Sequence, residues 1–177
     1  MPLATTPRVW AIGETVTAAE MNTEIQNQFN ALGAGIIPVV PKSSASTGTV
    51  TVGTTETRDA VLGDYVFTSV AGHRYRVCFD GATLSGSVAA DLFRVNVRNG
   101  GASTATAAST LVASTQVFIG AAGGPGQAGV AIGGSFVPGA GTQTLSIFYL
   151  RTNGTGVATP LNSGGNREFY VIDLGTV

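Results

Sequence analysis

The segments RYRVCFD, residues 74–80, and DLFRVNVRNGG, residues 91–101, alternate between apolar and polar side chains. Successive side chains of a β-strand point to opposite faces of a sheet, so a period of two predicts strands with one buried face. The predicted buried positions are Tyr75, Val77 and Phe79 in the first segment and Phe93, Val95 and Val97 in the second. The two segments therefore predict a sheet that covers a core on one side.

Similar short apolar segments recur from residue 47 onward, separated by turns rich in Gly, Asn and Pro. Asn99-Gly100 and Asn153-Gly154 are typical tight-turn dipeptides, and residues 120–126 predict an exposed loop. The predicted strands span about residues 47–54, 58–68, 73–82, 89–98, 110–119, 128–137, 143–151 and 167–174. Some eight short strands with this spacing predict a mainly β protein, a jelly-roll-like antiparallel sandwich.

One predicted strand, within TQTLSIFYLRTNG at residues 142–154, is apolar on both faces. Leu145, Ile147 and Tyr149 share one face, whereas Phe148 and Leu150 lie on the other. Such a strand is expected to be buried on both sides or to lie at a contact between subunits.

One short helix is predicted ahead of the β domain. Thr17 and Glu20 form a capping box, which places the helix start near Ala18, and glycines at 33 and 35 favour its end. The apolar positions recur at spacings of three and four, as in the seam of a coiled coil. The seam consists of Ala18, Met21, Ile25, Gln28 and Leu32, widened by Phe29.

A helix of about 15 residues is marginally stable alone in water, so its apolar face is expected to be covered. The partner is the same helix in symmetry-related copies, the β domain of the same subunit, or a different protein. We therefore divide the chain into an N-terminal arm with an oligomerisation or anchoring helix (1–35), a linker (36–46) and a β-sandwich (47–177). The candidate assembly residues are Trp10, Met21, Ile25, Gln28, Phe29 and Leu32.

The composition argues against two classes of partner. Only 11% of the residues are charged and the formal net charge is −1, so no excess of Lys and Arg is present to attract nucleic acid or an anionic membrane. No apolar run approaches the roughly 20 residues that a membrane-spanning helix needs. The single Cys excludes an intrachain disulfide.

The residues that could support catalysis or bind a metal are few. His73 is the only histidine and is expected to be a solvated turn residue, and Cys78 is expected to act as a small hydrophobe in its strand. Neither residue predicts a metal site, and no G-x-S-x-G nucleophile motif is present. The sequence predicts no enzyme activity and no cofactor. A β-sandwich hydrolase would require a Ser and an acid within reach of His73.

Two parts of the chain resemble a known group of proteins. The opening TPRVWAIGETVTAAEMNTEIQNQFNAL resembles the N-terminal segment of structural proteins of tailed phages, particularly those of actinobacteria, with the pattern P-R-x-W-x-x-G-E-x-V-T-A-A-x-M-N. The closing EFYVIDLG is similar to the final strand of the same proteins, and VFTSVAGHRYRV to an earlier strand pair. Their small β domains resemble trimeric jelly rolls of the tumour-necrosis-factor type.

The resemblance implies a virion component that forms homotrimers and contacts other tail or capsid proteins through its N-terminal arm. As a minor tail or tail-fibre protein it would contact the host surface, with sugar as the expected ligand. The alternative within the virion is a capsid decoration protein that clamps neighbouring capsomers. An alternative of another class is a stand-alone carbohydrate-binding module, which predicts a monomer that binds a defined glycan without residues 1–35.

Overall fold

The computed structural model describes residues 17–19, 42–44, 51–120, 126–162 and 167–177. These residues form ten β-strands, and residues 18 and 19 are helical. The strands are β1 (Lys42–Ser44), β2 (Thr57–Arg58), β3 (Tyr65–Ser69), β4 (His73–Gly86), β5 (Leu92–Asn99), β6 (Thr110–Phe118), β7 (Gly126–Phe136), β8 (Gly141–Asn153), β9 (Ala158–Asn162) and β10 (Arg167–Thr176).

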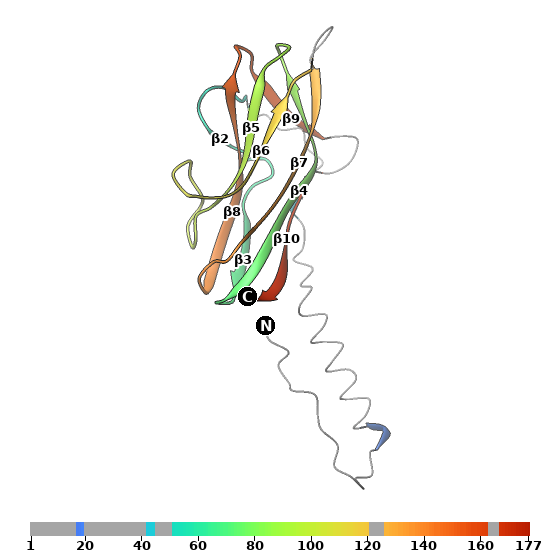
Figure 1. Ribbon diagram of the computed structural model, residues 1–177, viewed down its shortest axis with the longest axis vertical. Coiled ribbons are helices and arrows are strands. Elements are labelled where there is room, and N and C mark those ends of the chain that lie inside the picture. Colours follow the sequence, from blue (N-terminus) through green and yellow to red (C-terminus); the bar gives the residue numbers. More distant parts are fainter. Residues whose placement is uncertain (1–16, 20–41, 45–50, 121–125, 163–166) are drawn as a thin grey trace.

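The strands form two five-stranded antiparallel sheets that face each other. Sheet A has the order β1-β10-β4-β7, with β9 also pairing with β4, and sheet B has the order β2-β8-β5-β6, with β3 also pairing with β8. In Figure 1 the labelled strands of sheet B lie to the left of those of sheet A. We count β2 and β3 as one interrupted strand of sheet B. Most connections along the chain then cross from one sheet to the other, and the first strand, β1, pairs with the last, β10. This order is that of a jelly roll, so the predicted fold class is confirmed.

The core lies between the two sheets and contains the residues that the alternation predicted. Val77 and Phe79 of β4 face Val95 and Val97 of β5 across the sandwich, and all four side chains are buried. Phe169 of β10 stacks edge-on against Phe79, with ring centroids 6.2 Å apart. Burial of each large apolar side chain contributes about 1.5–3 kcal/mol, so this shared core is the main source of stability.

An ion pair crosses the core between the sheets. Arg167 begins β10 in sheet A, Asp59 follows β2 in sheet B, and both side chains are 0% exposed. The Asp59 carboxylate accepts hydrogen bonds from the Arg167 guanidinium and, at 3.0 Å, from the Tyr149 hydroxyl. Its other oxygen accepts from the backbone N–H groups of Val61 and Leu62. Asp59 thereby fixes the turn that separates β2 from β3 and ties it to the opposite sheet.

The structure differs from the predicted strands at four places. The predicted strand 58–68 is interrupted, because Asp59 binds the backbone of the following turn instead of continuing the ladder. Residues Lys42–Ser44, predicted within the linker, pair with β10 as β1. Strand β9 was not predicted, and of the predicted strand 47–54 only Val52 is paired, in an isolated bridge with Ala158, in the part that the structure describes.

Candidate functional site

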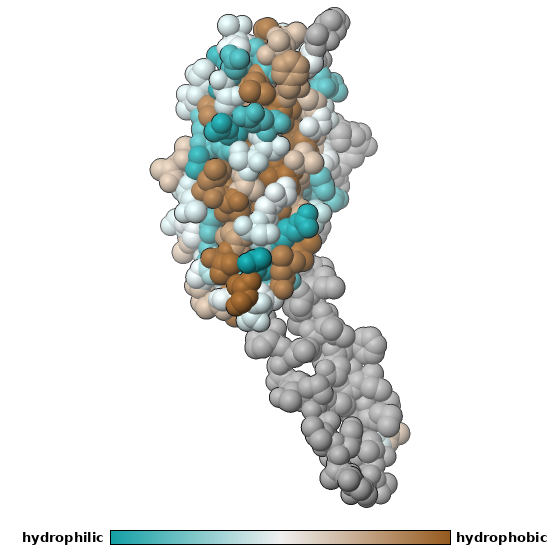
Figure 2. All heavy atoms as spheres, viewed as in Figure 1, coloured by the Kyte–Doolittle hydropathy of each residue, from teal (hydrophilic) through white to brown (hydrophobic). Residues whose placement is uncertain are grey.

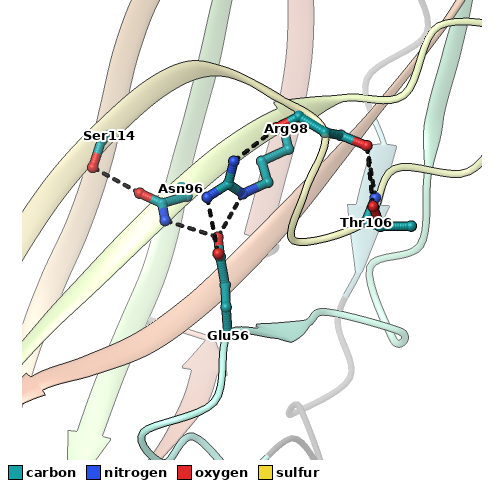
Figure 3. Close-up of polar contacts among 6 residues, drawn as sticks. Glu56, Asn96, Arg98, Thr106 and Ser114 are labelled. Atoms are coloured by element: carbon teal, nitrogen blue, oxygen red, sulfur yellow. Dashed lines mark hydrogen bonds and ion pairs between the residues drawn. The ribbon is translucent and has the colours of Figure 1, made fainter.

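The outer face of sheet B is covered by the segment that leads into β2. Glu56 accepts hydrogen bonds from Nε and Nη2 of Arg98, at 2.7 and 2.9 Å, and from Nδ2 of Asn96 at 2.8 Å (Figure 3). Asn96 in turn accepts from the Ser114 hydroxyl, and Arg98 Nη1 donates to the backbone oxygen of Ser109. This network holds residue 56 against β5 and anchors the loop before β6.

Glu56 is negatively charged at neutral pH. Burial acts to raise the pKa of Glu56, but the hydrogen bonds from Arg98 and Asn96 outweigh it, and the pKa lies below its ordinary value of 4.5. Phe148, on the outward side of β8, is buried, so the prediction that this strand has two buried faces is confirmed at that residue. The covered part of sheet B is therefore a structural surface rather than a free one.

Replacing Glu56 by Gln is expected to lower the free energy of unfolding at neutral pH. The difference in this free energy between the variant and the unchanged protein is expected to become smaller in acid. The folded-state pKa of Glu56 is lower than the unfolded value, so its contribution is present above about pH 4.5 and is lost as pH falls through the folded pKa. Urea unfolding measured between about pH 7 and pH 3 checks this. Glu168→Gln, at an exposed position of β10, is the control. A difference for Glu56→Gln that stays constant with pH would contradict the assignment.

The other side of the sandwich ends in an open edge formed by β6 and β7. In the described residues β6 pairs with β5 alone and β7 with β4 alone, so each strand has an unpaired backbone edge. The two strands contact one another across the sandwich and lie side by side in Figure 1. We call the exposed surface of these two strands the β6–β7 edge; it comprises residues 110–118 and 126–136.

The β6–β7 edge carries no charge. No Asp, Glu, Lys, Arg or His occurs anywhere between Arg98 and Arg151, so β6, β7 and nearly all of β8 lack ionisable groups of these types. Neither edge strand contains Pro. Natural proteins protect exposed edges with charges, Pro or short strands, because an unprotected edge pairs with other chains. β6 and β7 contain no charge and no Pro, and they are 9 and 11 residues long, so the edge lacks these three protections in the described residues.

The exposed side chains of the β6–β7 edge are uncharged, and most of them are small or apolar. Gly129, Ala131, Gly133 and Ser135 are exposed on the outward side of β7, together with Gln127, and Gln116 is exposed on β6. On β6, Leu111 is 48% and Phe118 is 58% exposed. Figure 2, in the same view as Figure 1, shows hydrophobic and intermediate side chains along this face, with hydrophilic groups among them. Interface cores are likewise depleted of charge and enriched in aromatic residues.

Close packing at Gly134 holds the two edge strands together. A Cβ atom at Gly134 would lie 2.6 Å from the Cβ of Ala113 on β6 and 3.3 Å from the backbone oxygen of Val112. The strand backbones therefore approach one another at a distance that only glycine allows.

Gly134→Ala is expected to lower the free energy of unfolding by about 1–3 kcal/mol, the usual effect of overpacking. Gly129→Ala is the matched control, because a Cβ at Gly129 would meet nothing within 4 Å. Reduced backbone freedom in the unfolded chain should make that change neutral or stabilising by up to about 1 kcal/mol. Urea titration of both variants is the measurement. Equal stabilities would show that β6 and β7 do not pack as described.

All six candidate assembly residues lie outside the described residues, namely Trp10, Met21, Ile25, Gln28, Phe29 and Leu32. Of the predicted helix only residues 17–19 are described; Thr17 precedes helical Ala18 and Ala19, and all three are exposed. The role of the helix in joining copies therefore stays a prediction.

His73 is not the solvated turn residue that the sequence predicted. Its side chain is 1% exposed, and Nδ1 lies 2.9 Å from Oδ2 of Asp173 on the adjacent β10. Burial acts to raise the pKa of Asp173, but the Gly175 N–H and then His73 lower it below its ordinary value of 3.8. The prediction was wrong because the chain reverses at Gly72, and His73 begins β4 with its ring on the buried face.

The His73–Asp173 pair supplies two members of the hydrolase arrangement considered from the sequence, but both side chains are buried, at 1% and 2% exposure. Cys78 is half-buried on the outer face of sheet A, opposite Tyr170. The neighbouring Cys78 is the main cause that raises the pKa of Tyr170, followed by burial.

The described residues contain no group of three or more His, Cys, Asp or Glu side chains that could hold a metal ion. The same part of the chain contains no helix with the length and apolar character needed to cross a membrane. The β6–β7 edge is therefore the feature of the described structure that most needs a functional explanation.

Comparison of the sequence with protein-family models and with curated proteins found no match.

Proposed function

We propose that the chain is a structural component of a bacteriophage virion, a trimeric β appendage of the minor tail or fibre type. The observation that carries the assembly part of the proposal is the uncharged, unpaired β6–β7 edge. The resemblance of the N-terminal segment to structural proteins of tailed phages carries the virion part. A jelly-roll domain with one core shared by two sheets suits a structural role.

The occupant of the β6–β7 edge in this proposal is a second copy of the chain. An N-terminal helix that joins copies would hold the β domains at a high effective concentration, so a modest contact between them suffices. Burial of the exposed halves of Phe118 and Leu111 contributes on the order of 1 kcal/mol for each side chain, and no ion has to be desolvated on this edge. In a closed ring of three copies, the edge of one copy contacts a different surface of the next.

Two alternative functions predict different locations or masses. A capsid decoration protein would share the trimer but lie on the phage head. A stand-alone carbohydrate-binding module would be a monomer whose glycan binding does not depend on residues 1–35. The mass in solution separates the module from both virion proteins.

The virion part is tested on phage particles. The chain is expected to copurify with intact particles produced by a host that carries its gene, in a copy number that is a multiple of three. Quantitative mass spectrometry of particles purified by density gradient measures this. If the chain remains with the lysate and the particles lack it, the virion function is rejected, whatever its oligomeric state.

A further inference from the structure

The chain contains two Asn-Gly dipeptides in turns, and the structure places them in opposite environments. Asn153 ends β8 and is exposed, as are Gly154 and Thr155. Asn99 ends β5 and is half-buried, as is Gly100. Asn-Gly sequences lose the Asn side-chain amide when the following backbone nitrogen attacks it, because glycine has no Cβ to hinder the approach. The environment of each pair decides whether this reaction can proceed.

At Asn153 the two reacting groups already lie together. The backbone nitrogen of Gly154 is 2.9 Å from Oδ1 of Asn153, so the carboxamide lies against the nitrogen that would attack it. Gly154 has a φ of +95°, a conformation that residues with a Cβ rarely adopt. Water reaches the exposed side chain, and water is the second reactant.

At Asn99 the same two groups are held apart by other bonds. The Gly100 N–H donates to the backbone oxygen of Thr144 at 2.9 Å, and the Asn99 amide donates to the side chain of Gln143 at 2.8 Å. Oδ1 of Asn99 accepts from Gly101, at 2.9 Å. These three hydrogen bonds direct the Gly100 nitrogen to Thr144 and the Asn99 carboxamide to Gln143 and Gly101, so the two reacting groups do not meet.

We propose that Asn153 is a site of spontaneous deamidation in the folded protein and that Asn99 is protected. The Gly154 nitrogen, after loss of its proton, forms a bond to Cγ of Asn153, and the side-chain nitrogen leaves as ammonia. The resulting five-membered succinimide is opened by water at either carbonyl, which yields aspartate or isoaspartate. The net reaction consumes one water, releases one ammonia and needs no oxidant or enzyme.

The modification has a structural consequence, because the turn rests on a buried carboxylate. Asp91 is buried and accepts hydrogen bonds from the backbone nitrogens of Thr155 and Gly156, at 3.1 and 2.7 Å. A Cβ at Gly154 would lie 1.7 Å from Oδ1 of Asp91, so no space exists for a displaced backbone. Isoaspartate adds a methylene to the backbone just before Gly154. It therefore forces this turn off Asp91 and exposes residues 153–157 to proteases.

The test compares the two Asn-Gly sites within one chain. The full-length protein is incubated at mildly alkaline pH, folded in one sample and unfolded in urea in the other, and the peptides containing Asn99 and Asn153 are followed by mass spectrometry. In the folded sample Asn153 is expected to convert at least several-fold faster than Asn99. In the unfolded sample the two sites are expected to convert at similar rates.

Two further measurements complete the test. Asn153→Ser should abolish the fast conversion without changing the slow one at Asn99. When protein incubated in this way is then treated briefly with a protease, the unchanged chain should be cut within residues 153–157 and the variant should not. Equal rates at the two sites in the folded protein would overturn the proposal. Faster deamidation of Asn99 than of Asn153 in the folded protein would overturn the proposal as well. So would an Asn153 that deamidates in urea but not in the folded protein.

Discussion

Replacing Arg167 by Met is expected to lower the free energy of unfolding by about 3–5 kcal/mol, the effect of leaving a buried charge without its partner. The guanidinium and the Asp59 carboxylate are both 0% exposed, and the carboxylate also accepts from the Tyr149 hydroxyl and two backbone nitrogens. Without Arg167, the buried Asp59 carboxylate loses its charged partner. Burial, followed by the charge of Asp59, already raises the pKa of Tyr149 well above its ordinary value.

Urea unfolding at neutral pH measures the effect, with Arg74→Met as the control. Arg74 also lies in a strand, but it is exposed, and its replacement should change stability by less than about 0.5 kcal/mol. Similar small losses in both variants would show that the pair does not link the sheets.

The second large effect is expected from a charge placed on the β6–β7 edge. Ala131 is an exposed, outward residue of β7, so Ala131→Glu should leave the fold intact. In the proposed trimer the same change buries an unpaired carboxylate at every contact, and misplaced interfacial charges cost several kcal/mol. The variant is therefore expected to sediment as a monomer at concentrations at which the unchanged chain is a trimer.

Val66→Glu is the matched control for the edge variant. Val66 is exposed on β3, which lies in sheet B on the opposite side of β8 from β5 and β6, so the added charge should not affect association. Circular dichroism checks that both variants keep the β fold. If both variants dissociate, or if neither does, the β6–β7 edge is not the surface through which the copies associate.

The alternation of apolar residues predicted the sheets and their core, because side-chain direction in a strand depends on local sequence alone. Phe93, Val95 and Val97 are each 0% exposed. The sequence did not predict the burial of Asp59 with Arg167, since the two residues are 108 positions apart and only the fold brings them together. The same limit applies to His73, whose partner Asp173 lies on another strand.

The candidate site was predictable only in part. The absence of charged residues between Arg98 and Arg151 is visible in the sequence, and it would have indicated a surface suited to burial. That β6 and β7 are the two unpaired strands is a property of the topology, which residue spacing does not determine. Met21, Ile25 and the other helix residues remain a prediction from heptad spacing.

The central claim, that copies of this chain associate through an uncharged sandwich edge, is tested most directly by the mass of the full chain in dilute native buffer. Light scattering coupled to size exclusion is expected to give three times the 17.8 kDa mass of one chain, over the whole concentration range in which the β domain stays folded. A folded species with the mass of a single chain throughout that range would contradict the claim.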